Sequence, residues 1–338
     1  MSSQIANQEK TEAPSQTSEN TKNIINNIKQ ALSLNEEDNN QSQNLETSKV
    51  SNDSTLTDSS STSKENNKLN EYLNSYDYFL FEQNFKKYYV DSSKNNNGNY
   101  DNYVKNALKL ISLIPFRKLF LNERIKEIAK KINFENLKNS SDANRKLLIL
   151  DLDETLIHSD LDFLLKEKNV KYDTVLYFDS EEEKNIPLPI IIRPGIYDFL
   201  DYASKNFDLV VFTASDQQYA DAIINYIERD KKYFKMRLYR NNCIFIDPGL
   251  YIKDLRIFDS FKKLEDIIIL DNSLFSFANQ LNNGILITSF FDDKEDTFLY
   301  NAKEYLEFIK NEKDIREVNK ENFRFEEIKE DISRNNNN

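Results

Sequence analysis

The strongest constraint on the fold is a run of four aliphatic residues that ends in two carboxylates. Residues 147–150 read Leu-Leu-Ile-Leu, and Asp151 and Asp153 follow directly. A run that is apolar at every position is typical of a parallel strand buried on both faces. Carboxylates at its end are costly to remove from water, so a cation or a catalytic role is expected for them. Taken alone, a strand followed by an acidic turn is an equally good interpretation.

Strand and helix patterns alternate from Lys146 onward, which predicts an α/β fold with a central parallel sheet flanked by helices. We expect its strands at residues 147–150, 209–212, 243–246, 267–270 and 285–287. We expect helices after Arg193-Pro194-Gly195, after Thr213-Ala214-Ser215 and over residues 298–309. Residues 173–179 and 187–192 are predicted to form a small hairpin-like β insertion between the first two central strands.

The chain divides into four regions by composition. Residues 1–68 are polar and lack a sustained apolar period, so we predict a disordered tail. Residues 69–142 carry apolar and aromatic side chains at helical spacing, broken at Pro115, and are predicted to form a helical extension. Residues 143–312 contain the α/β domain. Residues 313–338 are predicted to be a charged and weakly structured tail.

Composition excludes several kinds of protein. The formal net charge of −12 argues against direct nucleic-acid binding through the overall field. One cysteine, Cys243, and one histidine, His158, exclude a disulfide framework and a Cys/His zinc site. We expect Cys243 to be a buried thiol and His158 to have a packing or hydrogen-bonding role.

The sequence also carries a prediction about location. It has neither a secretory signal nor a stretch long and apolar enough for a transmembrane anchor, which predicts a soluble intracellular protein, nuclear or cytoplasmic. For residues 107–121, a basic amphipathic helix that lies on a membrane stays an open alternative.

Oxygen ligands end two of the predicted strands. In parallel α/β sheets, ligands gather at the carboxyl ends of the strands. Asp151, Asp153 and Asn272 offer the hard oxygen atoms that suit Mg²⁺, and Asp271 is close enough to act through a coordinating water. These four residues are the predicted metal site.

The remaining polar groups predict a phosphate site beside that metal. Thr213 offers a hydroxyl, and Ala214 offers a backbone N–H at the start of the helix expected there. Lys253 supplies a positive charge that would screen a carboxylate from a phosphate. A nucleophile, a metal, a phosphate cradle and a cation together predict phosphoryl transfer.

Five motifs occur in order along residues 143 to 310 of the chain. They are Asp-Leu-Asp-Glu-Thr-Leu-Ile-His-Ser, Arg-Pro-Gly, Phe-Thr-Ala-Ser, Tyr-Ile-Lys-Asp-Leu and Leu-Asp-Asn-Ser. In this order they resemble the small-CTD-phosphatase family, the NLI-interacting-factor-like phosphatases of the haloacid dehalogenase (HAD) superfamily. The resemblance implies a Rossmann-like HAD fold and a Mg²⁺-dependent protein serine/threonine phosphatase.

The resemblance also implies a role for each motif residue. Asp151 would be the nucleophile that forms an aspartyl-phosphate, while its other oxygen binds Mg²⁺. Asp153 would protonate the leaving alkoxide and then activate water, and its backbone carbonyl would also reach the metal. Thr155 would fix the turn between them. Thr213 and Lys253 would hold the phosphoryl group.

The last motif departs from the pattern of the family. Asn272 would complete the metal site with Asp271 in support, but the family usually has proline where Leu274 stands here. We expect this change to alter the stiffness of the loop without removing a ligand.

The insertion bears on the substrate. Residues 163–192 have room for only a short strand pair, so the site would stay open to a protein segment. By resemblance, the insertion would help to bind a proline-containing phosphopeptide, such as the phosphoserine repeats of the RNA polymerase II C-terminal domain. A basic run follows later in the chain and consists of Arg229, Lys231, Lys232, Lys235, Arg237 and Arg240. These residues would either attract such an acidic peptide or form a solvated face, and both interpretations stay open.

Two other functions are compatible with the same fold. One is a catalytically weak scaffold, as in mitochondrial import-receptor relatives. The other is a HAD phosphatase for small metabolites, which the short insertion disfavours.

Overall fold

The structure is a computed structural model that describes residues 100–113, 118–140, 145–160, 171–179, 184–246 and 250–336. The predicted disordered tail, the first part of the predicted helical extension and Pro115 lie outside these ranges. The chain forms two compact units. Residues 159–190 belong to the smaller unit, and the other described residues belong to the larger one.

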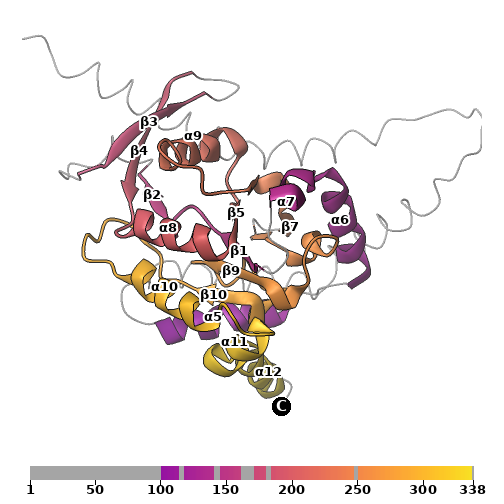
Figure 1. Cartoon of the computed structure of the whole chain (residues 1–338). Helices are drawn as coiled ribbons and strands as arrows, with labels where there is room; N and C mark the ends of the chain where they lie inside the picture. Colours follow the sequence, from indigo (N-terminus) through magenta and orange to yellow (C-terminus); the bar gives the residue numbers. More distant parts are fainter. Residues whose placement is uncertain are drawn as a thin grey trace, which may run out of the picture. The chain divides into compact units, whose positions relative to one another are not determined.

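A five-stranded parallel sheet lies in the larger unit (Figure 1). In spatial order its strands are β10 (Gly284–Leu286), β9 (Ile267–Asp271), β1 (Leu147–Leu150), β5 (Asp208–Phe212) and β6 (Met236–Leu238). Because β1 is the middle strand, Asp151 and Asp153 follow it between the ends of β9 and β5. The predicted α/β class is confirmed.

Both faces of this sheet are covered. Leu147 and Ile149 of β1 belong to a core cluster that also contains buried residues of the N-terminal helices. Leu148 and Leu150 point to the other face and are fully buried as well. This explains why the strand is apolar at every position instead of alternating.

Helices flank the sheet, and none of those described is both long and apolar enough to cross a membrane. They are α5 (Tyr100–Leu113), α6 (Lys118–Lys131), α7 (Glu135–Ser140), α8 (Ile196–Asn206), α9 (Gln217–Ile227), α10 (Phe298–Ile309), α11 (Ile315–Phe323) and α12 (Phe325–Asn336). Short 3₁₀ turns lie at η2 (Arg240–Asn242), η3 (Leu255–Phe258), η4 (Leu264–Asp266) and η5 (Leu281–Asn283). Gly195 precedes α8 with a φ of 80°, a backbone conformation that residues other than glycine rarely adopt.

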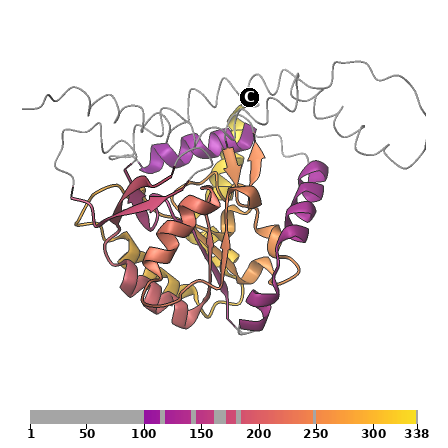
Figure 2. The same ribbon diagram turned by 90° about the horizontal axis from the view of Figure 1, so that it is seen from above.

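The predicted weakly structured tail is wrong for residues 315–336, which form α11 and α12. Ile315 and Phe325 are buried although charged residues surround them in sequence. α12 packs against α5 of the N-terminal region, and both views of the molecule place these two helices side by side (Figures 1 and 2). The charges lie on the outer sides of amphipathic helices, so their number alone does not reveal the fold.

One predicted central strand is also wrong. Residues 244–246 form β7 (Ile244–Ile246), which pairs antiparallel with β8 (Leu250–Ile252) in a separate two-stranded sheet. The place beside β5 is taken by β6, which the sequence did not predict. β6 has only three residues and a charged one, Arg237, at its centre, so it lacks the apolar run that marks the other strands.

The smaller unit contains the predicted β insertion. β3 (Thr174–Phe178) pairs antiparallel with β4 (Ile186–Ile192), and both lie within one residue of the expected ranges. The preceding strand is β2 (Ile157–Ser159). Val175 and Tyr177 of β3 are exposed and alternate with less exposed neighbours.

The basic run after α9 is neutralised within the fold. Each of its cations lies within salt-bridge distance of a carboxylate, in the pairs Arg229–Asp230, Lys231–Asp201, Lys232–Glu228, Lys235–Asp208, Arg237–Asp221, Arg237–Glu228 and Arg240–Asp216. These contacts favour a structural surface over a free positive patch for an acidic peptide.

Glu228 organises the turn between α9 and β6. Its buried side chain accepts hydrogen bonds from the N–H groups of Tyr233 at 2.7 Å and Phe234 at 2.8 Å. Burial alone would raise the pKa of Glu228, but these bonds and the bond from Arg237 hold it below the ordinary value of 4.5.

We expect Glu228→Gln to lower the free energy of unfolding by about 1–3 kcal/mol at pH 7, because the charge-assisted hydrogen bonds are lost. The depressed pKa means that the contribution is present above pH 4.5 and is lost as pH falls through the lower, folded-state pKa. In urea-unfolding curves, the difference in free energy of unfolding between the unaltered protein and Glu228→Gln should therefore shrink only below about pH 4.5. Glu304→Gln, at an exposed position of α10, is the control, and equal stability at pH 7 would contradict this role for Glu228.

Candidate active site

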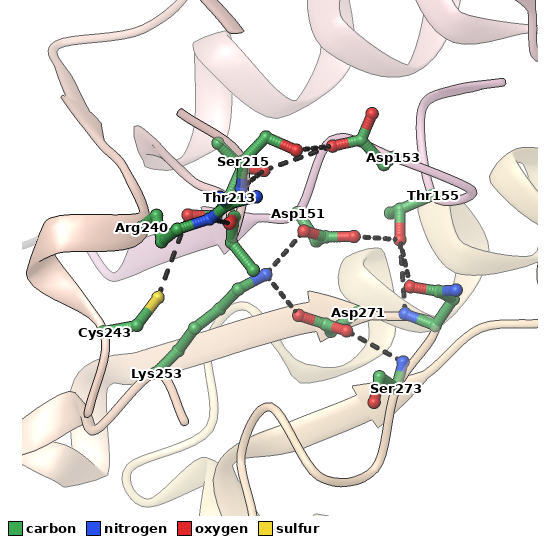
Figure 3. A network of polar contacts seen from close by, with 12 residues as sticks. Asp151, Asp153, Thr155, Thr213, Ser215, Arg240, Cys243, Lys253, Asp271 and Ser273 are labelled. Atoms are coloured by element: carbon green, nitrogen blue, oxygen red, sulfur yellow. Dashed lines mark hydrogen bonds and ion pairs between the residues drawn. The ribbon is translucent and has the colours of Figure 1, made fainter. Parts of the chain in front are cut away.

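A buried lysine joins two carboxylates at the end of the central strands (Figure 3). The Lys253 Nζ lies 2.5 Å from Asp151 Oδ1 and 2.7 Å from Asp271 Oδ2, and all three side chains are almost fully buried. Burial alone would lower the pKa of Lys253, but the charges of Asp151 and Asp271 raise it. Lys253 is therefore a fixed cation beside Asp151.

Asp271 is hydrogen-bonded both to this cation and to the loop after β9. Its Oδ2 accepts from Lys253, and its Oδ1 accepts from the Ser273 N–H at 2.8 Å. Burial raises the pKa of Asp271 to about 6, and the nearby charge of Asp151 acts in the same direction. Its predicted contact to a metal through water stays a prediction.

The hydroxyl of Thr155 joins the two strand ends that would hold a metal. Thr155 Oγ1 donates to Asp151 Oδ2 at 2.8 Å, lies 3.3 Å from Asn272 Oδ1 and accepts from the Asn272 N–H at 3.2 Å. Asn272 Nδ2 in turn donates to Ser289 Oγ at 3.0 Å. The side-chain oxygen of Asn272 is thus turned toward Thr155, whose hydroxyl also contacts Asp151.

Asp153 is surrounded by hydroxyl groups. Its Oδ2 accepts from Ser215 Oγ at 2.8 Å and from Thr213 Oγ1 at 3.2 Å, and its Oδ1 accepts from the hydroxyl of Tyr219. Burial raises the pKa of Asp153 to about 6, with the charge of Glu154 acting in the same direction. A carboxyl group with such a pKa exchanges protons near neutral pH, as an acid or base catalyst must.

The turn that carries these residues is held by buried contacts. Glu154 has a φ of 55°, an uncommon conformation for a residue other than glycine. Its carbonyl accepts from the Phe290 N–H at 2.8 Å. The fully buried Arg193 donates to the Thr155 carbonyl at 3.0 Å and forms two bonds of 2.8 Å to Asp296.

The predicted phosphate cradle differs in one detail. The helix expected directly after Thr213 begins only at Gln217, as α9. The intervening loop is held by the Ser215 N–H, which donates to Thr213 Oγ1 at 3.0 Å. It is also held by Arg240 Nε, which donates to the carbonyl of Ala214 at 2.7 Å.

The structure therefore brings all the predicted site residues to one edge of the sheet. Asp151, Lys253 and Asp271 form one cluster, and Thr155 links that cluster to Asn272. Asp153 lies with Thr213 and the loop that contains Ala214. The role of each residue stays a prediction.

Sequence reasoning missed the residues that hold this site in place. Arg193 and Ser215 belong to motifs that were recognised, but neither received a role. Tyr219 follows Ser215 by one helical turn, and that spacing was the only available signal. Nothing near Ser289 in the sequence indicated its contact with Asn272. The predicted hydrogen-bonding role of His158 agrees with its 3.2 Å contact to Glu154.

The residues present fit a hard metal ion such as Mg²⁺. Among the described residues, no group of three or more His, Cys, Asp or Glu side chains is arranged to hold a metal. Asp151 supplies a carboxylate oxygen and Asn272 an amide oxygen, and both contact the hydroxyl of Thr155. A combination of a small number of carboxylates with amide or carbonyl oxygens is typical of a Mg²⁺ site that keeps several waters.

A comparison with protein families gives one match over this region. The family model described as NLI interacting factor-like phosphatase matches residues 146–316. This range contains all of the candidate site residues named above and covers half of the chain.

Similar proteins occur in several organisms. CTD small phosphatase-like protein 2 of Dictyostelium discoideum is 34% identical over 54% of this chain and 30% of its own length. CTD nuclear envelope phosphatase 1B of Danio rerio is 36% identical over 53% of this chain and 72% of its own length. Nuclear envelope morphology protein 1 of Schizosaccharomyces pombe is 37% identical over 52% of this chain and 35% of its own length. The chain thus covers less than two thirds of two of these relatives.

We expect Lys253→Met to lower the free energy of unfolding by about 3–5 kcal/mol at pH 7, because two buried carboxylates lose their shared cation. Adding Asp271→Asn should restore part of that loss by removing one of the two charges. Urea unfolding of the single and double variants measures both effects, with Lys313→Met at an exposed position as control. A double variant less stable than Lys253→Met would rule out the proposed charge balance.

Proposed function

The chain belongs to the NLI interacting factor-like phosphatase family of the HAD superfamily, and on that premise we propose that it is a Mg²⁺-dependent protein serine/threonine phosphatase. One observation carries the proposal. Asp151 lies between the cation of Lys253 and the hydroxyl of Thr155, while Asp153, two residues later, has a pKa raised by burial to about 6. This arrangement supplies a fixed nucleophile and a separate proton carrier.

The first step is an attack of Asp151 on the substrate. A carboxylate oxygen of Asp151 bonds to phosphorus, the bond between phosphorus and the serine or threonine oxygen breaks, and Asp153 gives its proton to that oxygen. The products are the free hydroxyl side chain and an aspartyl-phosphate. Lys253, which contacts Asp151, and Thr213, which contacts Asp153, would bind the oxygens of the transferred group.

The second step returns the protein to its starting state. Asp153, now ionised, takes a proton from a water molecule whose oxygen bonds to phosphorus, and the bond from phosphorus to Asp151 breaks. Inorganic phosphate leaves, and the proton stays on Asp153 for the next cycle. Ser215 and Tyr219 hold the Asp153 carboxylate through both steps.

Three groups of this chain would hold the metal ion. They are a carboxylate oxygen of Asp151, the backbone carbonyl of Asp153 and the side-chain oxygen of Asn272. When bound, Mg²⁺ supplies positive charge that reduces the repulsion between the Asp151 carboxylate and the phosphate.

For the substrate, we propose phosphoserine segments of proteins, such as the RNA polymerase II C-terminal domain. The relatives named CTD phosphatases support this class, as does the small β3–β4 insertion. The nucleus or the cytoplasm is the proposed location.

We expect Asp151→Asn to reduce hydrolysis of an aryl phosphate and of a phosphoserine peptide by at least about 1,000-fold, because the nucleophile is lost. The measurement is phosphate release at millimolar Mg²⁺, with circular dichroism to verify the fold. Asp292→Asn, an exposed carboxylate in the loop before α10, is the matched control and should keep full activity.

Other results would redirect the proposal. Full activity of Asp151→Asn would rule out the nucleophile. Faster hydrolysis of sugar phosphates than of phosphopeptides by the unaltered protein would favour a metabolite phosphatase. A folded protein that hydrolyses none of these compounds would favour a scaffold.

We expect EDTA to abolish hydrolysis and added Mg²⁺ to restore it. Asn272→Ala should raise the Mg²⁺ concentration for half-maximal activity by at least about tenfold, since a metal ligand is lost. Asn301→Ala, exposed on α10, should leave that concentration unchanged. Undiminished hydrolysis in EDTA, after dialysis against the chelator, would exclude a metal-dependent reaction.

A further inference from the structure

The loop after β9 contains a buried backbone N–H whose partner comes from far along the chain. Leu274 is fully buried, and its N–H donates to the hydroxyl oxygen of Tyr103 on α5 at 3.2 Å. The two residues are 171 positions apart. A buried N–H without a partner is costly, so this contact is a requirement of the loop conformation.

The same loop positions two parts of the candidate site. Residues 271–276 contain Asp271, which holds the Lys253 ammonium, and Asn272, a proposed metal ligand. The Ser276 carbonyl accepts a hydrogen bond from the backbone N–H of Lys253 at 2.7 Å. A shift of this loop would therefore move both the cation and the amide oxygen relative to Asp151.

Helix α5 is itself firmly packed. Its buried residues Val104, Ala107, Leu108 and Ile111 share one core cluster with Leu274 and with residues of β1 and β9. It also packs against α12. A hydroxyl carried by such a helix has a fixed position against which the loop can be held.

We propose that Tyr103 is a positioning residue of the active site, through which the N-terminal helix α5 holds the loop that carries Asn272. The expected effect on catalysis rests on the proposed function, whereas the hydrogen bond between Tyr103 and Leu274 does not depend on it. In this proposal Tyr103 contacts neither substrate nor metal, and it acts on the site through the Leu274 N–H. Proline at position 274 would have no such donor, so the presence of leucine makes the tyrosine hydroxyl necessary.

The test is Tyr103→Phe in the full chain, which removes one oxygen and leaves the ring in place. The first measurement is amide hydrogen exchange of Leu274 in metal-free protein labelled with ¹⁵N-leucine. We expect exchange to become about tenfold faster, because the hydrogen bond is lost. The second measurement is the Mg²⁺ concentration for half-maximal hydrolysis of an aryl phosphate. This concentration should rise about three- to tenfold, a change no larger than is usual when a residue that orients a metal ligand is altered.

The matched control is Tyr305→Phe. The Tyr305 hydroxyl donates to Asn319 Oδ1 at 2.8 Å, between α10 and α11, away from the site. This variant also loses a hydrogen bond, but it should leave both Leu274 exchange and the Mg²⁺ requirement unchanged. An equal effect of the two variants would overturn the proposal, because it would reflect general loosening of the fold.

A double variant separates the contact from other effects of the tyrosine. Leu274→Pro removes the donor, so Tyr103→Phe added to it should cause no further change in Mg²⁺ requirement. A further rise would overturn the proposal. Unchanged Leu274 exchange in Tyr103→Phe would also overturn it, even if the unaltered protein hydrolysed no phosphate at all.

Discussion

The architecture of the site depends on one buried lysine shared by two carboxylates. Asp151 and Asp271 end neighbouring parallel strands, and without Lys253 their charges would be buried next to one another. Buried ion pairs contribute little net stability compared with apolar residues of the same size, because each charge must leave water. The cluster is therefore better explained by chemistry than by stability, since it places the Asp151 side chain beside a fixed cation.

The positions of four central strands along the chain, and most residues of the candidate site, could be predicted from sequence because both depend on local patterns. The apolar runs at Leu147 and Ile267 are long enough to mark buried strands, and the polar residues at their ends indicate the edge of the sheet where ligands are expected. β6 could not be found, since its three residues include a charged one. Residues 244–246 have the composition of a strand, but composition does not specify a strand's partner, and they pair with β8.

Contacts between distant segments account for the other differences. The partner of the Leu274 N–H lies in a helix that the sequence assigns to a separate extension, and the domain boundary predicted at residue 143 separates residues of one core. The basic run illustrates the same difficulty. Lys235 and Arg237 look like a positive surface in sequence, whereas the fold places a carboxylate against each of them. The role of a charge depends on neighbours that only the tertiary structure provides.

The position of β1 in the middle of the sheet also has a consequence for how the protein folds. The polar contacts of the site join residues 60, 102 and 117 positions apart, because they come from the positions directly after β5, β8 and β9. Contacts over such separations form slowly, since long segments must close before any of them is gained. The side chains of Asp151 and Lys253 therefore meet only when most of the chain is in place. A nascent chain that ends before residue 272 therefore lacks part of the candidate site.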